Sequence, residues 1–187
     1  RMTQLNDMRE TIGAALKMLG FSINTRDEKQ LAAARDLLIA WKHNLAKYDN
    51  EGYKRGLDSG EFLLVHGYSG DLWQVAQENK DIGILFPKEG VTMSCDEMVI
   101  PKDAPNAALA HDMINFLLDG KVAAENMEFI GYLCPNTAGL KNVSDDFLKN
   151  PAVTIPADVK AKAEVIEDLG SDLPKYTKVW DEVKAAK

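Results

Sequence analysis

The sequence predicts an α/β fold in which a largely parallel sheet is flanked by helices. Short apolar runs of strand length alternate with amphipathic segments of ten residues or more, and turn residues separate the two kinds of segment. With 187 residues, of which 45% are hydrophobic and 27% charged, the chain is long enough to bury a sizeable core. No apolar run approaches the roughly 20 residues that a membrane helix needs.

The first predicted elements are a strand over residues 2–5 and a helix over residues 7–19. Asp7 is a suitable N-cap for this helix. Glu10 stands three residues later, as in a capping box, in which the two side chains each accept a hydrogen bond from the other's backbone. Gly20 ends the helix, because glycine adopts the left-handed conformation at low cost.

A second helix is predicted to begin after Thr25 or Asp27 and to run to about Asn44. Its apolar residues, among them Leu38 and Trp41, recur at helical spacing. A short helix over residues 52–58 then leads into an apolar strand over residues 61–66.

The middle of the chain continues the alternation of strands and helices. Tyr68-Ser69-Gly70-Asp71 turns into a helix over residues 72–78, and residues 82–86 form a second apolar strand. Pro87-Lys88-Glu89-Gly90 is a turn by its chemistry. Residues 91–100 are expected to be extended as far as Pro101.

Helices dominate the rest of the chain. Residues 106–118 form an amphipathic helix, and residues 121–130 continue as helix after Gly120. A connection over residues 131–139 follows, and helices at 157–169 and 175–185 finish the chain. The apolar face of the helix over 106–118 consists of Ala110, Met113, Ile114 and Leu117. Such faces form cores by default, so Phe116 is expected in the core together with Leu38 and Trp41.

The composition limits the classes of function. The net charge is -7, from 29 acidic and 22 basic residues, so the chain repels nucleic acid and anionic membranes and favours cationic ligands. A mildly acidic surface also serves solubility alone. The three histidines (His43, His66 and His111) are far apart, and no metal-ligand spacing or cofactor motif is present.

The two cysteines, Cys95 and Cys134, form no C-x-x-C pattern. They are either joined by a disulfide in an oxidising compartment or two separate, partly buried thiols, and the second interpretation is favoured. The chain opens on Arg1 rather than Met, which is typical of a processed or excised piece. The absence of a secretion signal therefore does not argue for the cytoplasm.

Several short motifs occur in one order along most of the chain, and together they carry a resemblance. They are Asp7-Met8-Arg9-Glu10 through Leu19-Gly20-Phe21, Tyr68-Ser69-Gly70-Asp71-Leu72-Trp73-Gln74, Phe86-Pro87-Lys88-Glu89-Gly90, Asp96 with Ile100-Pro101, Ile114-Asn115-Phe116-Leu117-Leu118, and Ile130-Gly131-Tyr132 with Pro135-Asn136. Each motif is weak alone, but the ordered set resembles the C-terminal portion of the periplasmic spermidine/putrescine-binding proteins of ABC transporters.

The resemblance implies a periplasmic-binding-protein-like (type II) fold and a transport role without catalysis. Two lobes close on an extended amine and present it to a membrane permease. Carboxylates hold the ammonium groups by charge-assisted hydrogen bonds, and aromatic rings cover the methylene groups. The location that it implies is periplasmic, or extracytoplasmic as a membrane-anchored lipoprotein.

Residue by residue, the resemblance nominates Asp7 and Glu10 as carboxylates that grip one amine. Tyr68 occupies the place of a cleft tryptophan, Asp96 that of the central carboxylate, and Tyr132 that of an aromatic from the other lobe. Two further positions depart from the family pattern. Ser94 stands where the family commonly has a large aromatic residue, and Glu167 falls near the position of a polar amide, so the exact amine stays open.

Each nominated residue has a structural alternative. Asp7 and Glu10 can be a capping box alone, although different oxygens of Asp7 can serve both roles. Tyr68 can be an ordinary turn aromatic, and Tyr132 can pack under its own connection. Asp96 is expected in a buried strand region, where an unpaired carboxylate is costly, so a role toward the ligand is favoured for it.

The family layout assigns residues 1–94 and 139–187 to the second lobe and residues 95–138 to a segment that crosses to complete the first lobe. The rest of the first lobe is expected upstream of Arg1, from the same protein or a partner chain, and a lone piece is expected to exchange this segment between two copies. A binding protein for another small solute is the alternative. A hydrolase that uses Asp7 with Glu10, or Asp71 with Glu61, lacks any accompanying motif.

Overall fold

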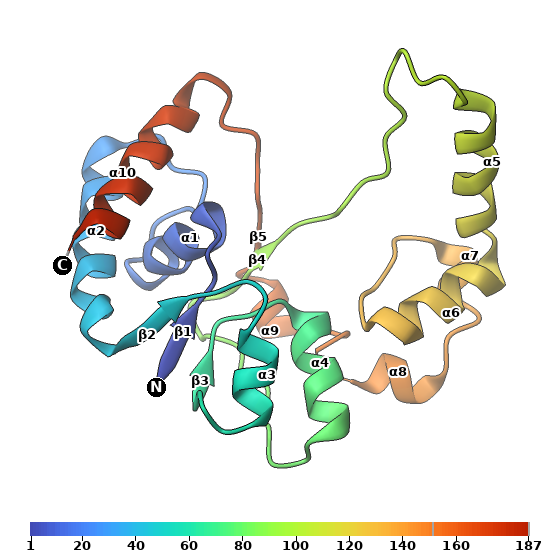
Figure 1. The fold of residues 1–187 in the computed structure, drawn as a ribbon, viewed down its shortest axis with the longest axis horizontal. Helices are drawn as coiled ribbons and strands as arrows, with labels where there is room; N and C mark the ends of the chain where they lie inside the picture. Colours follow the sequence, from blue (N-terminus) through green and yellow to red (C-terminus); the bar gives the residue numbers. More distant parts are fainter. Residues whose placement is uncertain (151, 187) are drawn as a thin grey trace.

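The strands form two small parallel sheets. The computed structural model describes residues 1–150 and 152–186. In the first sheet the order is β2-β1-β3, from β1 (Met2–Gln4), β2 (Leu45–Tyr48) and β3 (Leu64–Val65), and both pairings are parallel (Figure 1). The second sheet pairs β4 (Thr92–Met93) with β5 (Glu164–Val165), also in parallel. The predicted parallel α/β class is confirmed.

Three helices enclose the main core. They are α1 (Met8–Met18), α2 (Glu28–Trp41) and α10 (Leu173–Ala185), and they lie together on one side of the molecule (Figure 1). Their buried faces contribute all but one residue of a cluster that Leu169, just before residue 170, completes: Ile12, Ala15, Leu16, Leu31, Ala34, Leu38, Tyr176, Val179, Trp180 and Val183. Two short 3-10 helices, η1 (Lys42–Asn44) and η2 (Gly170–Asp172), adjoin α2 and α10.

The remaining helices are α3 (Tyr53–Asp58), α4 (Ser69–Glu78), α5 (Ala107–Leu117), α6 (Gly120–Ile130), α7 (Thr137–Leu140), α8 (Asp145–Lys149) and α9 (Ala157–Lys160). In Figure 1, α5, α6, α7 and α8 form the opposite side of the molecule, and α3, α4 and α9 lie between the two sides. A second, smaller core joins α6 and α8 through Met127, Phe147 and Val153. The Trp73 ring of α4 meets the Phe147 ring edge-on with 6.0 Å between centroids, so α4 connects this side to the three-stranded sheet.

The start of α1 shows why local signals succeed. Asp7 is in the extended conformation and its side chain accepts hydrogen bonds from the backbone N–H groups of Arg9 and Glu10. Gly20 follows the last turn with φ of +75°, the left-handed conformation that glycine adopts without steric cost. The second predicted cap is resolved in favour of Asp27, which accepts from the backbone of Lys29 and Gln30.

Two predicted elements are wrong and two strands were missed. Residues 82–86 form no strand, although the turn after them is present with a hydrogen bond from Gly90 N to the carbonyl of Pro87 at 3.0 Å. The predicted helix over 157–169 is only α9, after which the chain extends into β5. The other missed strand is β2, which follows η1. β2 and β5 form because each pairs with a segment that is distant in the sequence, and residues 82–86 form no strand because they lack such pairing among the described residues. Pairing therefore overrides the local pattern.

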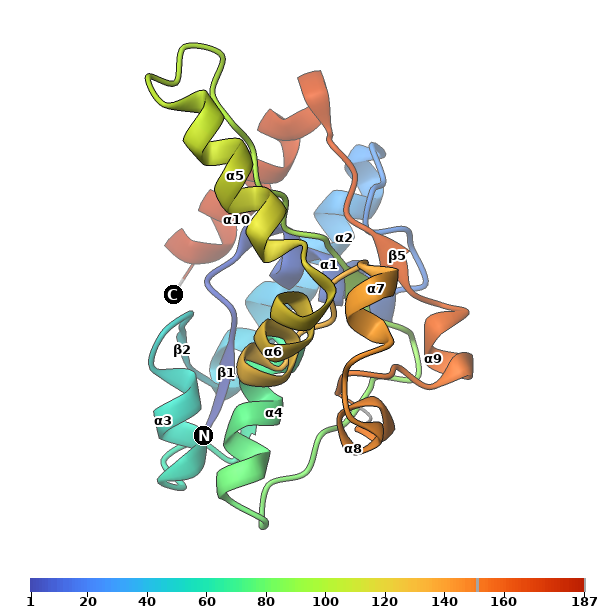
Figure 2. The ribbon, with the colours of Figure 1, turned by 90° about the vertical axis from the view of Figure 1, so that its right-hand side faces the viewer.

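Helix α5 forms as predicted but does not pack as predicted. None of its residues is buried, and Phe116 and Leu109 are 58% and 67% exposed. Figures 1 and 2 both show α5 projecting away from the rest of the chain. The assignment of Phe116 to the core is therefore wrong, whereas Leu38 is fully buried.

Two simple expectations concern cysteines and membranes. Cys95 and Cys134 are both free, Cys134 half-buried and Cys95 exposed, so the thiols are unpaired as favoured but only one is partly buried. None of the helices in the described part of the chain is both long and apolar enough to cross a bilayer.

Candidate ligand-binding site

The candidate site lies at the carboxyl ends of two neighbouring parallel strands. Asp7 follows β1, and Tyr68 follows β3 at the N-cap of α4. Because the strands are parallel neighbours, the side chains beyond their ends share one edge of the sheet, where α/β folds bind ligands. The hydroxyl of Tyr68 donates to Oδ2 of Asp7 at 3.3 Å. Two residues that are 61 positions apart in the sequence thus meet.

Asp7 divides its two oxygens between two roles. Oδ1 accepts from the backbone N–H groups of Arg9 at 2.9 Å and Glu10 at 3.0 Å. Oδ2 faces Tyr68 and has no other hydrogen bond among the described residues. The capping alternative is therefore correct for one oxygen, and the second oxygen keeps acceptor capacity for a ligand.

Glu10 is not the second half of a capping box. Its carboxylate is buried, with the residue 7% exposed, and accepts a hydrogen bond from the hydroxyl of Thr92 on β4. Burial raises the pKa of Glu10, and the nearby charge of Asp7 adds to that rise. The spacing alone predicts the reciprocal contact, and in the structure the hydroxyl of Thr92 on β4 is the donor instead.

The two carboxylates have no cationic partner of their own. Within residues 1–150 and 152–186, neither Asp7 nor Glu10 takes part in a salt bridge. The charge of Arg9 lowers the pKa of Glu10, but its guanidinium donates elsewhere, to the carbonyl of Glu167 at 2.8 Å and to Oδ1 of Asn24 at 2.7 Å. An acidic pair without a counter-ion favours a positively charged ligand.

Tyr132 reaches the same region from the segment after α6. Its hydroxyl accepts a hydrogen bond from the backbone N–H of Asp71 at 3.3 Å. Its ring lies so close to Gly70 that a Cβ there would be 2.1 Å from a ring carbon. Burial is the main cause of its raised pKa, and the charges of Asp71 and Asp96 contribute. Tyr132 therefore packs on the start of α4 and lies within electrostatic reach of Asp96.

Asp71 already has its own partners. Its Oδ2 accepts from the hydroxyl of Tyr53 at 2.6 Å, and its Oδ1 lies 3.3 Å from the ammonium group of Lys54. Glu61, its proposed partner in the hydrolase alternative, is exposed. The charge of Asp71 is therefore compensated by Lys54, whereas Asp7 and Glu10 form no salt bridge among the described residues.

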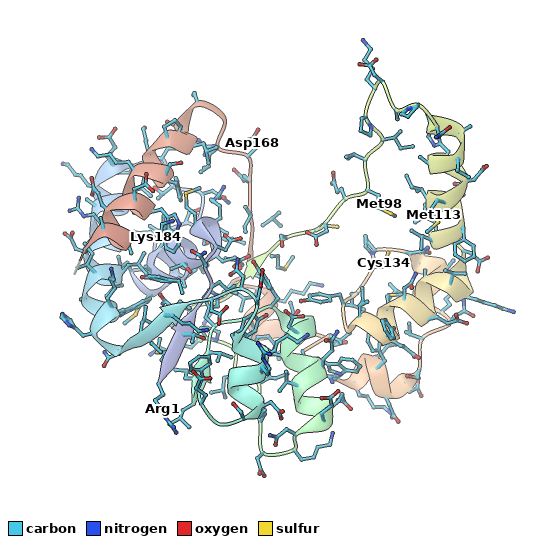
Figure 3. All side chains as sticks on the ribbon, in the orientation of Figure 1. Arg1, Met98, Met113, Cys134, Asp168 and Lys184 are labelled. Atoms are coloured by element: carbon cyan, nitrogen blue, oxygen red, sulfur yellow. The ribbon has the colours of Figure 1, made fainter. Side chains whose placement is uncertain are left out.

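The other nominated residues lie on open segments. Ser94 and Asp96 are exposed and lie beyond the end of β4, so the expectation of a buried strand around Asp96 is wrong. Glu167 is also exposed, and only its backbone forms hydrogen bonds, with Asn24 and Arg9. Figure 3 shows Met98, two residues beyond Asp96, on the segment leading away from β4, and Asp168 on the segment leading from β5 to α10.

One residue near the site was not predicted. His66 lies at the end of β3, two residues before Tyr68, and its Nδ1 is buried without a hydrogen-bond partner in the described part of the chain. Burial lowers the pKa of His66 to about 4, against an opposing effect of the Asp7 charge. The signal in the sequence is a titratable residue at the end of the predicted apolar strand over residues 61–66.

Residues 3–155 match the family of bacterial extracellular solute-binding proteins. The chain belongs to this family. Among curated relatives of this chain, the putrescine/cadaverine-binding protein of Pseudomonas aeruginosa is 34% identical over 98% of the chain and 54% of that protein. The spermidine/putrescine-binding periplasmic protein 1 of Haemophilus influenzae is 28% identical over 98% of the chain and 51% of that protein.

Solved structures agree with the fold of this chain. A protein from Listeria monocytogenes superposes with a TM-score of 0.89 at 29% identity, over 100% of the chain and 58% of that protein. The periplasmic-binding-protein-like lobe is thereby confirmed. The chain spans about half the length of the curated relatives that it matches.

Proposed function

We propose that this chain is part of the extracytoplasmic binding component of an ABC uptake system for polyamines. The observation that carries the proposal is the acidic pair Asp7 and Glu10, which lies beside Tyr68 and has no cation of its own among the described residues. An ammonium group exchanges its hydration for charge-assisted hydrogen bonds, so unpaired carboxylates are its natural partners. The names of the relatives, which bind putrescine, cadaverine or spermidine, support the same class of ligand.

In the proposed site Asp7 and Glu10 hold one amine, and Tyr68 and Tyr132 face its methylene groups. Asp96 holds a second amine, because two ammonium groups on one ligand require separated carboxylates. Ser94 leaves space where an aromatic ring would stack, and Glu167 adds a carboxylate near the entrance. The net charge of -7 attracts such cations from a distance.

The proposed layout assigns residues 1–94 and 139–187 to one lobe and residues 95–138 to a segment that completes the other. The absence of buried residues in α5 supports this layout, because a helix with an exposed apolar face needs a partner. The remainder of the longer protein, or an exchanged segment of a second copy, supplies that partner. The location proposed is the periplasm, as for the Haemophilus relative, or the outer face of a membrane, and a permease receives the ligand.

Catalysis is not part of the proposal. The relatives in this family are solute-binding transport proteins. In the alternative pair, Asp71 is half-buried and forms a salt bridge with Lys54, whereas Glu61 is exposed. A binding protein for another small solute is the second candidate. An anionic solute would require arginine, serine and backbone N–H donors in the site, and the acidic pair opposes it.

Calorimetric titration of the complete two-lobed protein tests the proposal. We expect putrescine or spermidine to bind with a dissociation constant well below about 1 mM, and amino acids and sugars to give no heat. The isolated 187-residue chain is expected to bind far more weakly because half of the cleft is absent. Silence of the complete protein toward all amines would contradict the polyamine assignment.

A further inference from the structure

Strand β4 lies against one face of α1 (Figure 1). Glu10, Gly13 and Lys17 are spaced three and four positions apart, so they line up along that face of the helix. Thr92 of β4 contacts both Glu10 and Gly13. Glu164 of β5 contacts Lys17, with 2.7 Å between its Oε1 and the ammonium nitrogen. The paired strands β4 and β5 are therefore held against the helix on which Glu10 lies.

The two branches of the Thr92 side chain meet different groups on α1. Its hydroxyl donates a hydrogen bond to Oε2 of Glu10. Its methyl group lies beside Gly13, where an added Cβ would be 3.2 Å from the methyl carbon. Because χ1 of a β-branched residue turns both branches together, the contact of the methyl group with Gly13 fixes the direction of the hydroxyl.

The hydroxyl of Thr92 binds only one of the two oxygens of Glu10. Oε2 accepts that hydrogen bond, whereas Oε1 accepts none among the described residues. Unlike Nδ1 of His66, Oε1 is not both enclosed and unpartnered, so it is accessible to solvent although the residue as a whole is only 7% exposed. One oxygen of a buried carboxylate is thus held from within the protein, and the other is open to a ligand.

The hydrogen bond from Thr92 is also the main local effect that favours the ionised form of Glu10. Burial is the largest cause of the raised pKa of Glu10, the bond from Thr92 is the largest effect in the opposite direction, and the charge of Asp7 adds to the rise. The other charged or titratable groups on the surrounding elements are Arg9 and Lys17 of α1, Tyr68 at the start of α4, and Glu164 of β5. None of them forms a salt bridge with Glu10 in the part of the chain that the structure describes.

We propose that Thr92 is a positioning residue of the candidate site: its hydroxyl holds Oε2 of Glu10 and leaves Oε1 directed at the amine. The hydrogen bond favours the carboxylate over the neutral acid, because a donor stabilises the charged form. Thr92 acts through Glu10 and does not itself touch the ligand. The assignment rests on the proposed function, since it takes an ammonium group as the ligand of Glu10.

A carbon NMR titration of the complete, ligand-free protein tests the hydrogen bond. The carboxyl signal of Glu10 is identified by its loss in Glu10→Gln. We expect Thr92→Val to raise the pKa of Glu10 by about one unit, because valine keeps the branched shape but has no donor, and Thr92→Ser to leave it nearly unchanged. Thr177→Val, which removes a hydroxyl on the exposed surface of α10, is the matched control. An unshifted pKa of Glu10 in Thr92→Val would refute the proposed role.

Calorimetry with putrescine separates positioning from packing alone. In the complete protein Thr92→Val should weaken putrescine binding by about ten-fold at pH 5 and by less at pH 8, because a one-unit rise in pKa lowers the ionised fraction by up to ten-fold. Thr92→Ser should bind nearly as tightly as the unsubstituted protein. Equal weakening of Thr92→Val at both pH values, or a Thr92→Ser variant as weak as Thr92→Val, would overturn the proposal.

A Glu10→Gln background gives a second test in which no buried carboxylate is left unpaired. If Thr92 acts through Glu10, Thr92→Val should change putrescine affinity in that background by less than about two-fold. Additive losses would contradict the positioning role. Failure of the complete protein to bind any amine would contradict the proposed function and leave the NMR titration intact. An unshifted pKa in a protein that binds putrescine would remove only the assignment of Thr92, so the two proposals fail separately.

Discussion

The hydroxyl of Tyr68 donates a hydrogen bond to Oδ2 of Asp7 across 3.3 Å, and this contact joins the ends of β3 and β1. The other oxygen of Asp7 caps α1. One carboxylate thus links the sheet, a helix start and the candidate site.

A double-mutant cycle measures this contact in the 187-residue chain. Tyr68→Phe should lower the free energy of unfolding by about 1 kcal/mol, and the loss should largely disappear when Asp7→Asn is already present. Urea denaturation gives the four values. Asp7→Asn combined with Tyr132→Phe is the control, because Tyr132 bonds to Asp71 instead. Additive effects of Tyr68→Phe and Asp7→Asn would mean that the contact contributes nothing.

Glu10→Gln should act in opposite directions on stability and on binding. Burial raises the pKa of Glu10, so the ionised form opposes folding. The protonated carboxyl group contributes stability that is fully present below the ordinary pKa and is lost as pH rises through the folded value. The neutral amide should therefore increase the free energy of unfolding of the ligand-free chain at pH 7, measured in urea.

In the complete protein the same change should weaken putrescine binding by about ten-fold or more, because a charge-assisted hydrogen bond is worth about 1.5–3 kcal/mol. Calorimetry measures the affinity. Glu61→Gln, at an exposed position, should change neither property. A variant Glu10→Gln that binds putrescine normally would remove Glu10 from the proposed site.

His66 should make the chain sensitive to mild acid. Its pKa is lowered to about 4 by burial, so the unfolded chain binds a proton between about pH 6.5 and 4 that the folded chain does not. The resulting contribution is complete above pH 6.5, is lost as pH falls through the folded value, and amounts to roughly 3 kcal/mol. Urea denaturation from pH 4 to 7 should show this slope.

His66→Gln should flatten most of the slope, whereas His111→Gln, on the exposed surface of α5, should preserve it. The imidazole signals of His66 in an NMR titration give its pKa directly. Titration of His66 near pH 6.5 would contradict the burial seen at the end of β3.

Asp96→Asn should weaken amine binding by tens-fold in the complete protein, since the proposed site uses Asp96 for a second ammonium group. Because Asp96 is exposed and outside any strand, stability of the 187-residue chain should be unchanged. Asp103→Asn, also exposed on the same open segment, is the matched control. Unchanged putrescine affinity of Asp96→Asn, measured by calorimetry, would show that this carboxylate does not face the ligand.

Gly70→Ala should displace Tyr132. A Cβ at Gly70 would lie 2.1 Å from the ring of Tyr132, so the ring must shift, and we expect a loss of about 1–3 kcal/mol in the free energy of unfolding. Gly83→Ala is the control, because no atom lies within 4 Å of its Cβ position. Thermal or urea unfolding compares the two variants. Equal stability of both would mean that the ring moves away without cost.

The helices were predictable wherever their signals are local. The cap at Asp7, the stop at Gly20 and the turn ending at Gly90 all act within a few residues, and the structure contains each of them. Strands were predicted less well. Apolar residues 82–86 form no strand because no segment of residues 1–150 or 152–186 pairs with them, whereas β2 forms at Leu45–Tyr48 because β1 pairs with it.

The candidate site divides in the same way. The sequence by itself determined the parallel α/β class, the family and the acidic residues after β1, because these depend on residue type, order and spacing. Only the tertiary structure decided that Glu10 bonds to Thr92 rather than to Asp7, that Tyr68 reaches Asp7, and that Asp96 is exposed. The physical reason is that a side chain takes the best donor within its reach, and segments that are distant in sequence bring that donor near.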